Sequence, residues 1–155
     1  MKKWTSEIEI NAPIEKVWDL FDGSLENMQK IMPQVIENTP VKETEEKVGS
    51  VTRQKYKEGK RVEEYDVETL LYKNEPNEKE LKVGFTLAKM FEITAHYKLE
   101  KIDENRTFFK YTVTNKALKW FVKFFLLFAT EKVVTQFMKR VKKVAEEESE
   151  VLVNN

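Results

Sequence analysis

The stretch Glu7–Phe21, which reads E-I-E-I-N-A-P-I-E-K-V-W-D-L-F, decides the fold. Its first hydrophobic residues, Ile8 and Ile10, lie two positions apart, which is the period of a half-buried strand. The next ones follow the i, i+3, i+4, i+7 spacing of an amphipathic helix and are Ile14, Val17, Trp18 and Phe21. Pro13 suits the first helical turn, because its missing N–H would have no partner there. The stretch therefore predicts a strand that leads directly into a short helix.

The rest of the chain continues with a helix, a series of strands and a long helix. Ser24 can cap a second short helix, and Pro33 ends it. Residues 34–46 predict a strand with a loop, and further strands follow up to about Ala117. Beyond Ala117 the strand period disappears and a helical period begins.

Alternation within these strands predicts which side chains share a buried face. The expected inward residues are Tyr65, Val67, Thr69 and Leu71; Leu81, Val83, Phe85 and Leu87; Phe91, Ile93, Ala95, Tyr97 and Leu99; and Phe109, Tyr111 and Val113. On the final helix the apolar face is Val134, Phe137, Met138, Val141 and Val144. A sheet with one apolar face needs a covering layer, and this helix is the available one.

The predicted fold class is therefore α+β. We expect a bent antiparallel sheet of about six to seven strands wrapped around a long C-terminal helix, with two short helices after the first strand. Residues 1–148 are expected to form a single domain. Residues 149–155 are expected to be a frayed tail, because acidic residues near a helix C-terminus oppose the helix dipole.

The N-A-P-I-E-K-V-W motif between the first strand and helix resembles the opening of the START-like superfamily. More narrowly, the chain resembles the SRPBCC or polyketide cyclase–dehydratase branch, which shares the helix-grip fold of the major pollen allergens. One departure is Met32, since a Trp commonly stands before the residue equivalent to Pro33. The resemblance implies a cavity between sheet and helix. It implies no particular catalytic residue, because members of the branch that catalyse reactions share no common motif.

Composition excludes several classes of function. Lys plus Arg and Asp plus Glu both number 27, so no excess of positive charge favours nucleic acid as a partner. The 155 residues contain no Cys, and the four glycines do not form a phosphate-binding loop. The N-terminal residues have no apolar core of signal-peptide length, and no apolar run reaches the eighteen residues of a membrane span. We expect a cytoplasmic protein without cofactor, metal site or transmembrane segment.

The abundance of large side chains leaves two interpretations of the interior. Ten Phe, five Tyr, three Trp and five Met could fill the core, or they could line a hollow one. An empty cavity of about 300 Å³ would cost on the order of 7 kcal/mol, so a large one must hold water or a ligand. The candidate ligand-binding residues are Tyr65, Val67, Thr69, Val83, Phe85, Ile93, Tyr97, Tyr111, Val113, Val134, Phe137 and Met138.

Other chemical groups in the sequence have less specific patterns. His96, the single histidine, is expected to face solvent. In the acidic run Glu63-Glu64-Tyr65-Asp66-Val67-Glu68, the alternation places Glu64, Asp66 and Glu68 outward, which argues against paired-carboxylate catalysis. The strand that contains Arg53 has no clear inward face. Arg53 could therefore be exposed, or could hold a carboxylate within the cavity.

Two further segments have more than one interpretation. The apolar run Leu118–Ala129 is either a helical turn under the rim of the sheet or an element that touches a membrane. The basic run Lys139–Lys143 lies on the final helix, and all of its residues except Val141 are expected to face water.

Three hypotheses of function follow. The first is a non-catalytic binder or carrier of a small hydrophobic molecule, such as a lipid, an aromatic polyketide-like compound or an isoprenoid. The second is a cyclase or dehydratase that uses the cavity tyrosines or Arg53. The third is a module that meets a membrane or protein through residues 118–129. The expected assembly is a monomer or weak homodimer.

Overall fold

The computed structural model describes residues 1–87, 89–118 and 131–154, and in these ranges it has seven strands and three helices. In chain order they are β1 (Lys2–Ile10), α1 (Ile14–Asp19), α2 (Leu25–Ile31), β2 (Val35–Lys42), β3 (Val51–Glu58), β4 (Arg61–Asn74), β5 (Glu78–Leu87), β6 (Phe91–Asp103), β7 (Arg106–Ala117) and α3 (Glu131–Asn154). The predicted α+β class and order of elements are confirmed.

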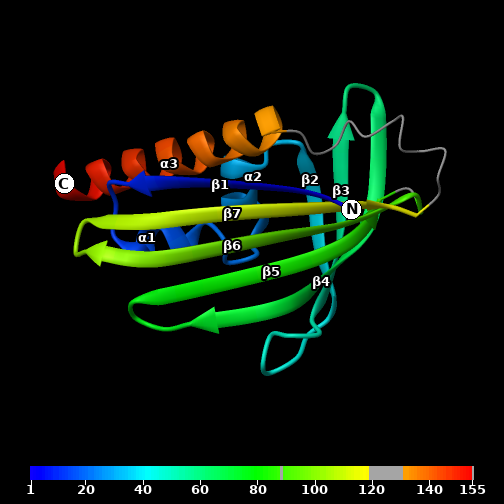
Figure 1. The fold of residues 1–155 in the computed structure, drawn as a ribbon, viewed down its shortest axis with the longest axis horizontal. Helices are drawn as coiled ribbons and strands as arrows, with labels where there is room; N and C mark the ends of the chain where they lie inside the picture. The colour runs from blue at the N-terminus through cyan, green and yellow to red at the C-terminus, as the bar shows by residue number, and fades with distance from the viewer. Residues whose placement is uncertain (88, 119–130, 155) are drawn as a thin grey trace.

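All seven strands form one antiparallel sheet in the order β1-β7-β6-β5-β4-β3-β2. The first strand lies beside the last one, so the N-terminal and C-terminal parts of the chain meet on the same side of the sheet. Figure 1 shows α3 running along β1, while the sheet bends so that β2 and β3 lie across the direction of β1, β7 and β6. This is the predicted arrangement of a bent sheet around a long C-terminal helix.

The two short helices begin where the sequence predicts. Pro13 is the residue before α1, and its carbonyl accepts the N–H groups of Lys16 and Val17 at 3.0 and 3.2 Å. Ser24 caps α2, because its hydroxyl accepts the N–H of Asn27 at 3.2 Å. Both helices therefore start on local signals and need no distant contact to set their first turn.

The predicted inward face is correct for β6, where every second residue from Phe91 to Leu99 is buried. On β4 the prediction for Leu71 is wrong. A bulge between Thr69 and Leu71 adds one residue, so the inward position passes to Tyr72. The inserted residue, Leu70, lies on the outer face over Gly84, where a Cβ atom would come within 2.9 Å of the Leu70 Cδ1.

One charged residue, Lys79, lies on the inward face of β5 and is only 2% exposed. Its Nζ lies 3.0 Å from a carboxylate oxygen of Glu15 on α1 and donates to the Oδ1 of Asn74. The same Nζ lies 5.8 Å from the ring centroid of Trp18. Because a buried ammonium needs partners, these contacts fix α1 against the sheet.

Helix α3 packs against the sheet and the short helices through one apolar face. Its buried residues include Val134, Met138, Val141 and Ala145, each at most 2% exposed. Most of them join one core cluster with Ile10 of β1 and with α1. The predicted packing face is thus confirmed for Val134, Met138 and Val141, and Ala145 joins it.

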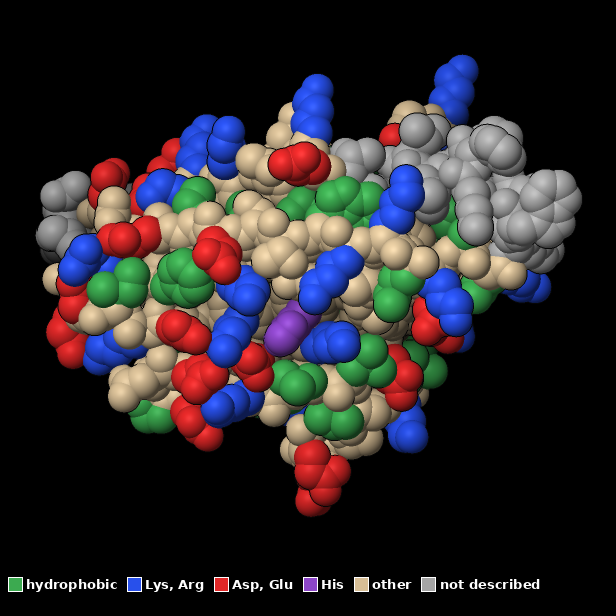
Figure 2. Space-filling model, viewed as in Figure 1, with side chains coloured by type: hydrophobic (Ala, Val, Ile, Leu, Met, Phe, Trp, Pro, Cys, Tyr) green, Lys and Arg blue, Asp and Glu red, His purple; other side chains and the backbone are tan. Residues whose placement is uncertain are grey.

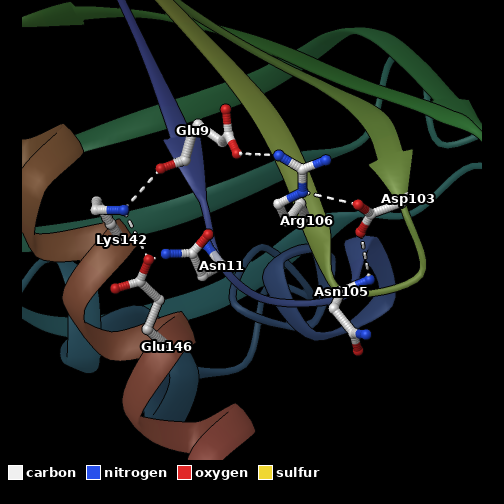
Figure 3. Close-up of polar contacts among 7 residues, drawn as sticks. All are labelled: Glu9, Asn11, Asp103, Asn105, Arg106, Lys142 and Glu146. Carbon is white, nitrogen blue, oxygen red and sulfur yellow. Dashed lines mark hydrogen bonds and ion pairs between the residues drawn. The ribbon is translucent and has the colours of Figure 1, made fainter.

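Polar contacts hold the middle of α3 to the end of β1 (Figure 3). The Lys142 Nζ donates to the Glu9 carbonyl and to Glu146, both at 2.7 Å, and the Asn11 N–H donates to Glu146 at 2.8 Å. Arg106 of β7 donates to the Glu9 carboxylate at 3.0 Å. The corner between β1 and α1 is therefore joined to both α3 and the sheet.

The residues predicted to fray, 149–155, are helical here as far as Asn154. Fraying is an opening reaction in solution, so it stays a prediction, as does the domain boundary at residue 148.

Glu146 supplies a test of the α3 docking. Burial raises the pKa of its carboxyl, but hydrogen bonds from Lys142 and the Asn11 N–H outweigh burial, so the pKa is lowered. A lowered folded-state pKa stabilises the protein above the unfolded-state pKa of about 4.3, and this stabilisation is lost as pH falls through the folded value. We expect Glu146→Gln to lower the free energy of unfolding at neutral pH by about 1 kcal/mol and to flatten its decline in acid.

Urea denaturation at a series of pH values measures both effects. The control is Glu147→Gln, because Glu147 is exposed on the same helix. Equal acid sensitivity of the Glu146→Gln and wild-type proteins would show that this carboxylate does not help to dock α3.

Candidate ligand-binding cavity

A cavity of about 700 Å³ lies between the inward face of the sheet, the two short helices and α3. Eleven of the twelve predicted site residues line it: Tyr65, Val67, Thr69, Val83, Phe85, Ile93, Tyr97, Tyr111, Val113, Val134 and Phe137. The interpretation of a core filled by its own aromatic residues is therefore wrong. That these residues bind a ligand stays a prediction.

Met138 is the predicted residue that does not line the cavity. It is 1% exposed and packs in the core cluster with β1 and α1. Successive residues of a helix point about 100° apart, so Phe137 can face the cavity while Met138 faces the core. The prediction treated the two as members of one face.

Aromatic rings form the wall on the side of β6 and β7. The rings of Tyr97 and Tyr111 stack with centroids 5.2 Å apart and planes 4° from parallel. The ring centroid of Phe137 on α3 lies 4.8 Å from that of Tyr111, and the ring centroid of Phe21 lies 4.7 Å from that of Tyr97. Such a wall presents flat, rigid apolar surfaces.

The phenols in this wall are kept neutral. Burial raises the pKa of Tyr97 well above its ordinary value and also raises the pKa of Tyr65 and Tyr111. At neutral pH these side chains can donate hydrogen bonds, but they do not act as bases.

Several apolar lining residues were absent from the predicted set. They are Trp18, Leu20, Phe21, Met28, Met32, Val35, Tyr72, Leu81, Ala95 and Val133. Alternation had placed Leu81 and Ala95 inward, so for them the signal existed. For Tyr72 the alternation gave the wrong face, because the β4 bulge shifts which residues point inward and the sequence does not indicate where the bulge occurs.

Strand β3 supplies a polar wall that the sequence did not reveal. Thr52, Gln54 and Tyr56 line the cavity, and Gln54 is only 8% exposed. Apart from Val51, the alternate residues of β3 are also polar, so no hydrophobic period marks the inward side. Arg53 lies on the outer face, with its Nε 2.9 Å from Asp66, so the alternative of a cavity role for Arg53 is wrong.

Arg140 corrects the prediction for the basic run on α3. It lines the cavity, and its guanidinium donates to the Ile31 carbonyl of α2 at 3.2 Å. Together with Val133, Gln136 and Phe137 it follows the i, i+3, i+4, i+7 spacing of one helix face. A second face beside the core face could have been found by this spacing.

The outer face of the sheet carries the remaining candidate groups. Figure 2 shows the single histidine among charged side chains on this face. The His96 Nε2 lies 3.6 Å from Glu80, and burial lowers the pKa of the imidazole, as do three neighbouring lysines, although Glu80 opposes them. Among the four acids of the acidic run, Glu63 alone lines the cavity, and it pairs with Arg61 at 2.7 Å.

The residues that the structure describes contain neither a metal-binding cluster nor a membrane-spanning helix. No group of three His, Cys, Asp or Glu could hold a metal ion there, and no helix there is long and apolar enough to cross a membrane. Apart from Leu118, which is 45% exposed, the apolar run that was considered for membrane contact lies outside the described residues.

A family model described as polyketide cyclase / dehydrase and lipid transport matches residues 1–146. The chain belongs to this family. A search of curated protein sequences finds no match.

Several solved structures share the fold of the present chain at low sequence identity. Norcoclaurine synthase from Thalictrum flavum is 16% identical, covers 95% of both chains and has a TM-score of 0.66. The major latex-like protein 151 from Panax ginseng is 16% identical over 96% of this chain and 97% of its own, with a TM-score of 0.66. An aromatase/cyclase from a Streptomyces species is 14% identical over 96% and 90%, with a TM-score of 0.62. These likenesses confirm the helix-grip fold.

The buried phenols give a prediction for alkaline pH. A raised folded-state pKa means that their stabilisation is complete below the unfolded-state value of about 10 and is lost as pH rises through the folded value. In a near-ultraviolet titration of tyrosinate, we expect Tyr97→Phe and Tyr111→Phe to give the wild-type absorbance near pH 10. In guanidinium, each variant should lose one tyrosine's share of the signal. A loss of that size in the folded variant would contradict the neutral, buried pair.

Proposed function

We propose that this protein binds or carries a small hydrophobic molecule in the cavity between the sheet and α3, without catalysing a defined reaction. The observation that carries the proposal is a cavity of about 700 Å³ with an aromatic wall. Membership of a family that includes lipid transport supports it. The expected ligands are lipids, aromatic polyketide-like compounds or isoprenoids.

The free energy of an empty cavity supports an occupied one. At roughly 24 cal/mol per Å³, a dry space of this volume would cost about 17 kcal/mol, which exceeds the usual stability of a domain. The space is therefore filled by water or by a ligand. Displacement of water from aromatic surfaces such as those of Tyr97 and Phe137 favours an apolar occupant.

The cavity phenols favour binding over catalysis. An acid–base catalyst needs a pKa near the working pH, and burial moves the pKa values of Tyr65, Tyr97 and Tyr111 further from neutrality. The names of two similar structures, a norcoclaurine synthase and an aromatase/cyclase, keep an enzyme as the alternative. A cytoplasmic location and a monomeric or weakly dimeric state stay predictions.

Native mass spectrometry of freshly purified protein, followed by organic extraction, tests the proposal. We expect an additional mass of a few hundred daltons on the wild type. Ala95→Phe places a ring in the cavity, because Ala95 lines it, and should strongly reduce that mass. The control is Val62→Phe, because Val62 is 49% exposed on β4.

Uptake of the fluorescent apolar compound N-phenyl-1-naphthylamine covers the case of a ligand lost in purification. The wild type and Val62→Phe should bind it, and Ala95→Phe should bind it at least tenfold more weakly. A wild type that carries no additional mass and takes up no N-phenyl-1-naphthylamine would refute the proposed function.

A further inference from the structure

We propose that the ligand is an amphiphile with a carboxylate head group, and that Arg140 binds this carboxylate inside the cavity. The inference rests on the proposed function and specifies its ligand class. It depends on the side of the cavity formed by α3, α2 and β3, which differs in chemistry from the aromatic wall of β6 and β7.

Arg140 is a cation without an acidic partner. Every Asp and Glu of the chain lies in the described part of the structure, and none of them lies within ion-pair distance of Arg140. One nitrogen of the guanidinium donates to the Ile31 carbonyl, which fixes its position at the cavity wall. An arginine has five N–H donors in a planar fork, so donors remain for a ligand.

The neighbouring acids near this wall are already engaged or exposed. Glu63 is paired with Arg61 at 2.7 Å, and Asp22 accepts hydrogen bonds from Ser24 and Asn27, both at 2.9 Å. Glu58 is exposed at the end of β3. The positive charge of Arg140 is thus left for whatever enters the cavity, and a carboxylate matches its fork geometry.

Two uncharged side chains on β3 line the same cavity as Arg140 and add hydrogen-bonding capacity to it. The Gln54 amide is 8% exposed and donates only to the Met28 sulfur, at 3.6 Å, which is a weak acceptor. Tyr56 lines the same cavity; burial and Glu58 raise the pKa of its phenol, and the charge of Arg140 opposes them. An anion at Arg140 could therefore accept hydrogen bonds from an amide or a phenol as well.

The apolar wall fixes the orientation of such a ligand. Phe137 lies one turn before Arg140 on the same face of α3, and it contacts the stacked Tyr97 and Tyr111. A molecule with its carboxylate on Arg140 would place its hydrocarbon part along these rings. The cavity is therefore built for a molecule with one acidic end and one apolar part.

Competition against N-phenyl-1-naphthylamine tests the inference with two matched compounds, dodecanoic acid and dodecan-1-ol. At neutral pH we expect the wild type to bind the acid roughly 10- to 100-fold more tightly than the alcohol. Arg140→Gln should abolish this preference while it still binds N-phenyl-1-naphthylamine. Arg140→Lys should keep part of the preference, because it retains the charge and loses the fork.

The matched control is Arg53→Gln, which removes an arginine of the outer face and should keep the full preference. Equal binding of acid and alcohol by the wild type would overturn the inference. A preference for the acid that survives in Arg140→Gln would also overturn it. Both outcomes would leave the proposed function intact. A wild type that carries no additional mass and binds no N-phenyl-1-naphthylamine would overturn both. If Arg140→Gln does not fold, the wild-type ratio and Arg140→Lys decide the question.

Discussion

A single helix must cover the apolar face of a seven-stranded sheet that is much wider than the helix. The rest of the structure depends on this difference in width. Seven strands at about 4.8 Å spacing are about 29 Å wide, whereas a helix with its side chains is about 10 Å wide. Helix α3 packs mainly against β1, β7 and the two short helices. The sheet bends to bring its other strands over the helix (Figure 1), and the space that remains between them is the cavity.

The molecule has a closely packed end and an end that encloses the cavity. At one end, Val141 and Ala145 pack against α1 and β1, Lys79 is buried with its partners, and Glu146 joins α3 to the β1 corner. Along the cavity, Phe137 and the stacked Tyr97 and Tyr111 border an open space of about 700 Å³. Close packing at the first end is what allows the second to stay open, because a domain has only a few kcal/mol of net stability.

The cavity has two kinds of wall because the elements that form its sides differ in how their polar and apolar residues alternate. Strands β5 to β7 alternate clearly between apolar and polar residues, so their inward faces are aromatic or aliphatic. Strand β3 carries polar residues on both of its faces. On α3, Arg140 lines the cavity next to the apolar residues of that helix. A cavity of this kind can select a ligand by its polar end as well as by its apolar volume.

By itself the sequence determined the order of elements, the caps and the inward face of the regular strands, because periods of 2 and 3.6 residues are local properties. Tyr97 and Tyr111 were predicted correctly for that reason. Only the tertiary structure decided that Tyr72 replaces Leu71, since a bulge changes parity without a sequence signal. It also decided that Arg140 faces the cavity and Arg53 does not. Which face of a largely polar strand points inward, and what the second face of a helix contacts, depend on the elements that pack against them.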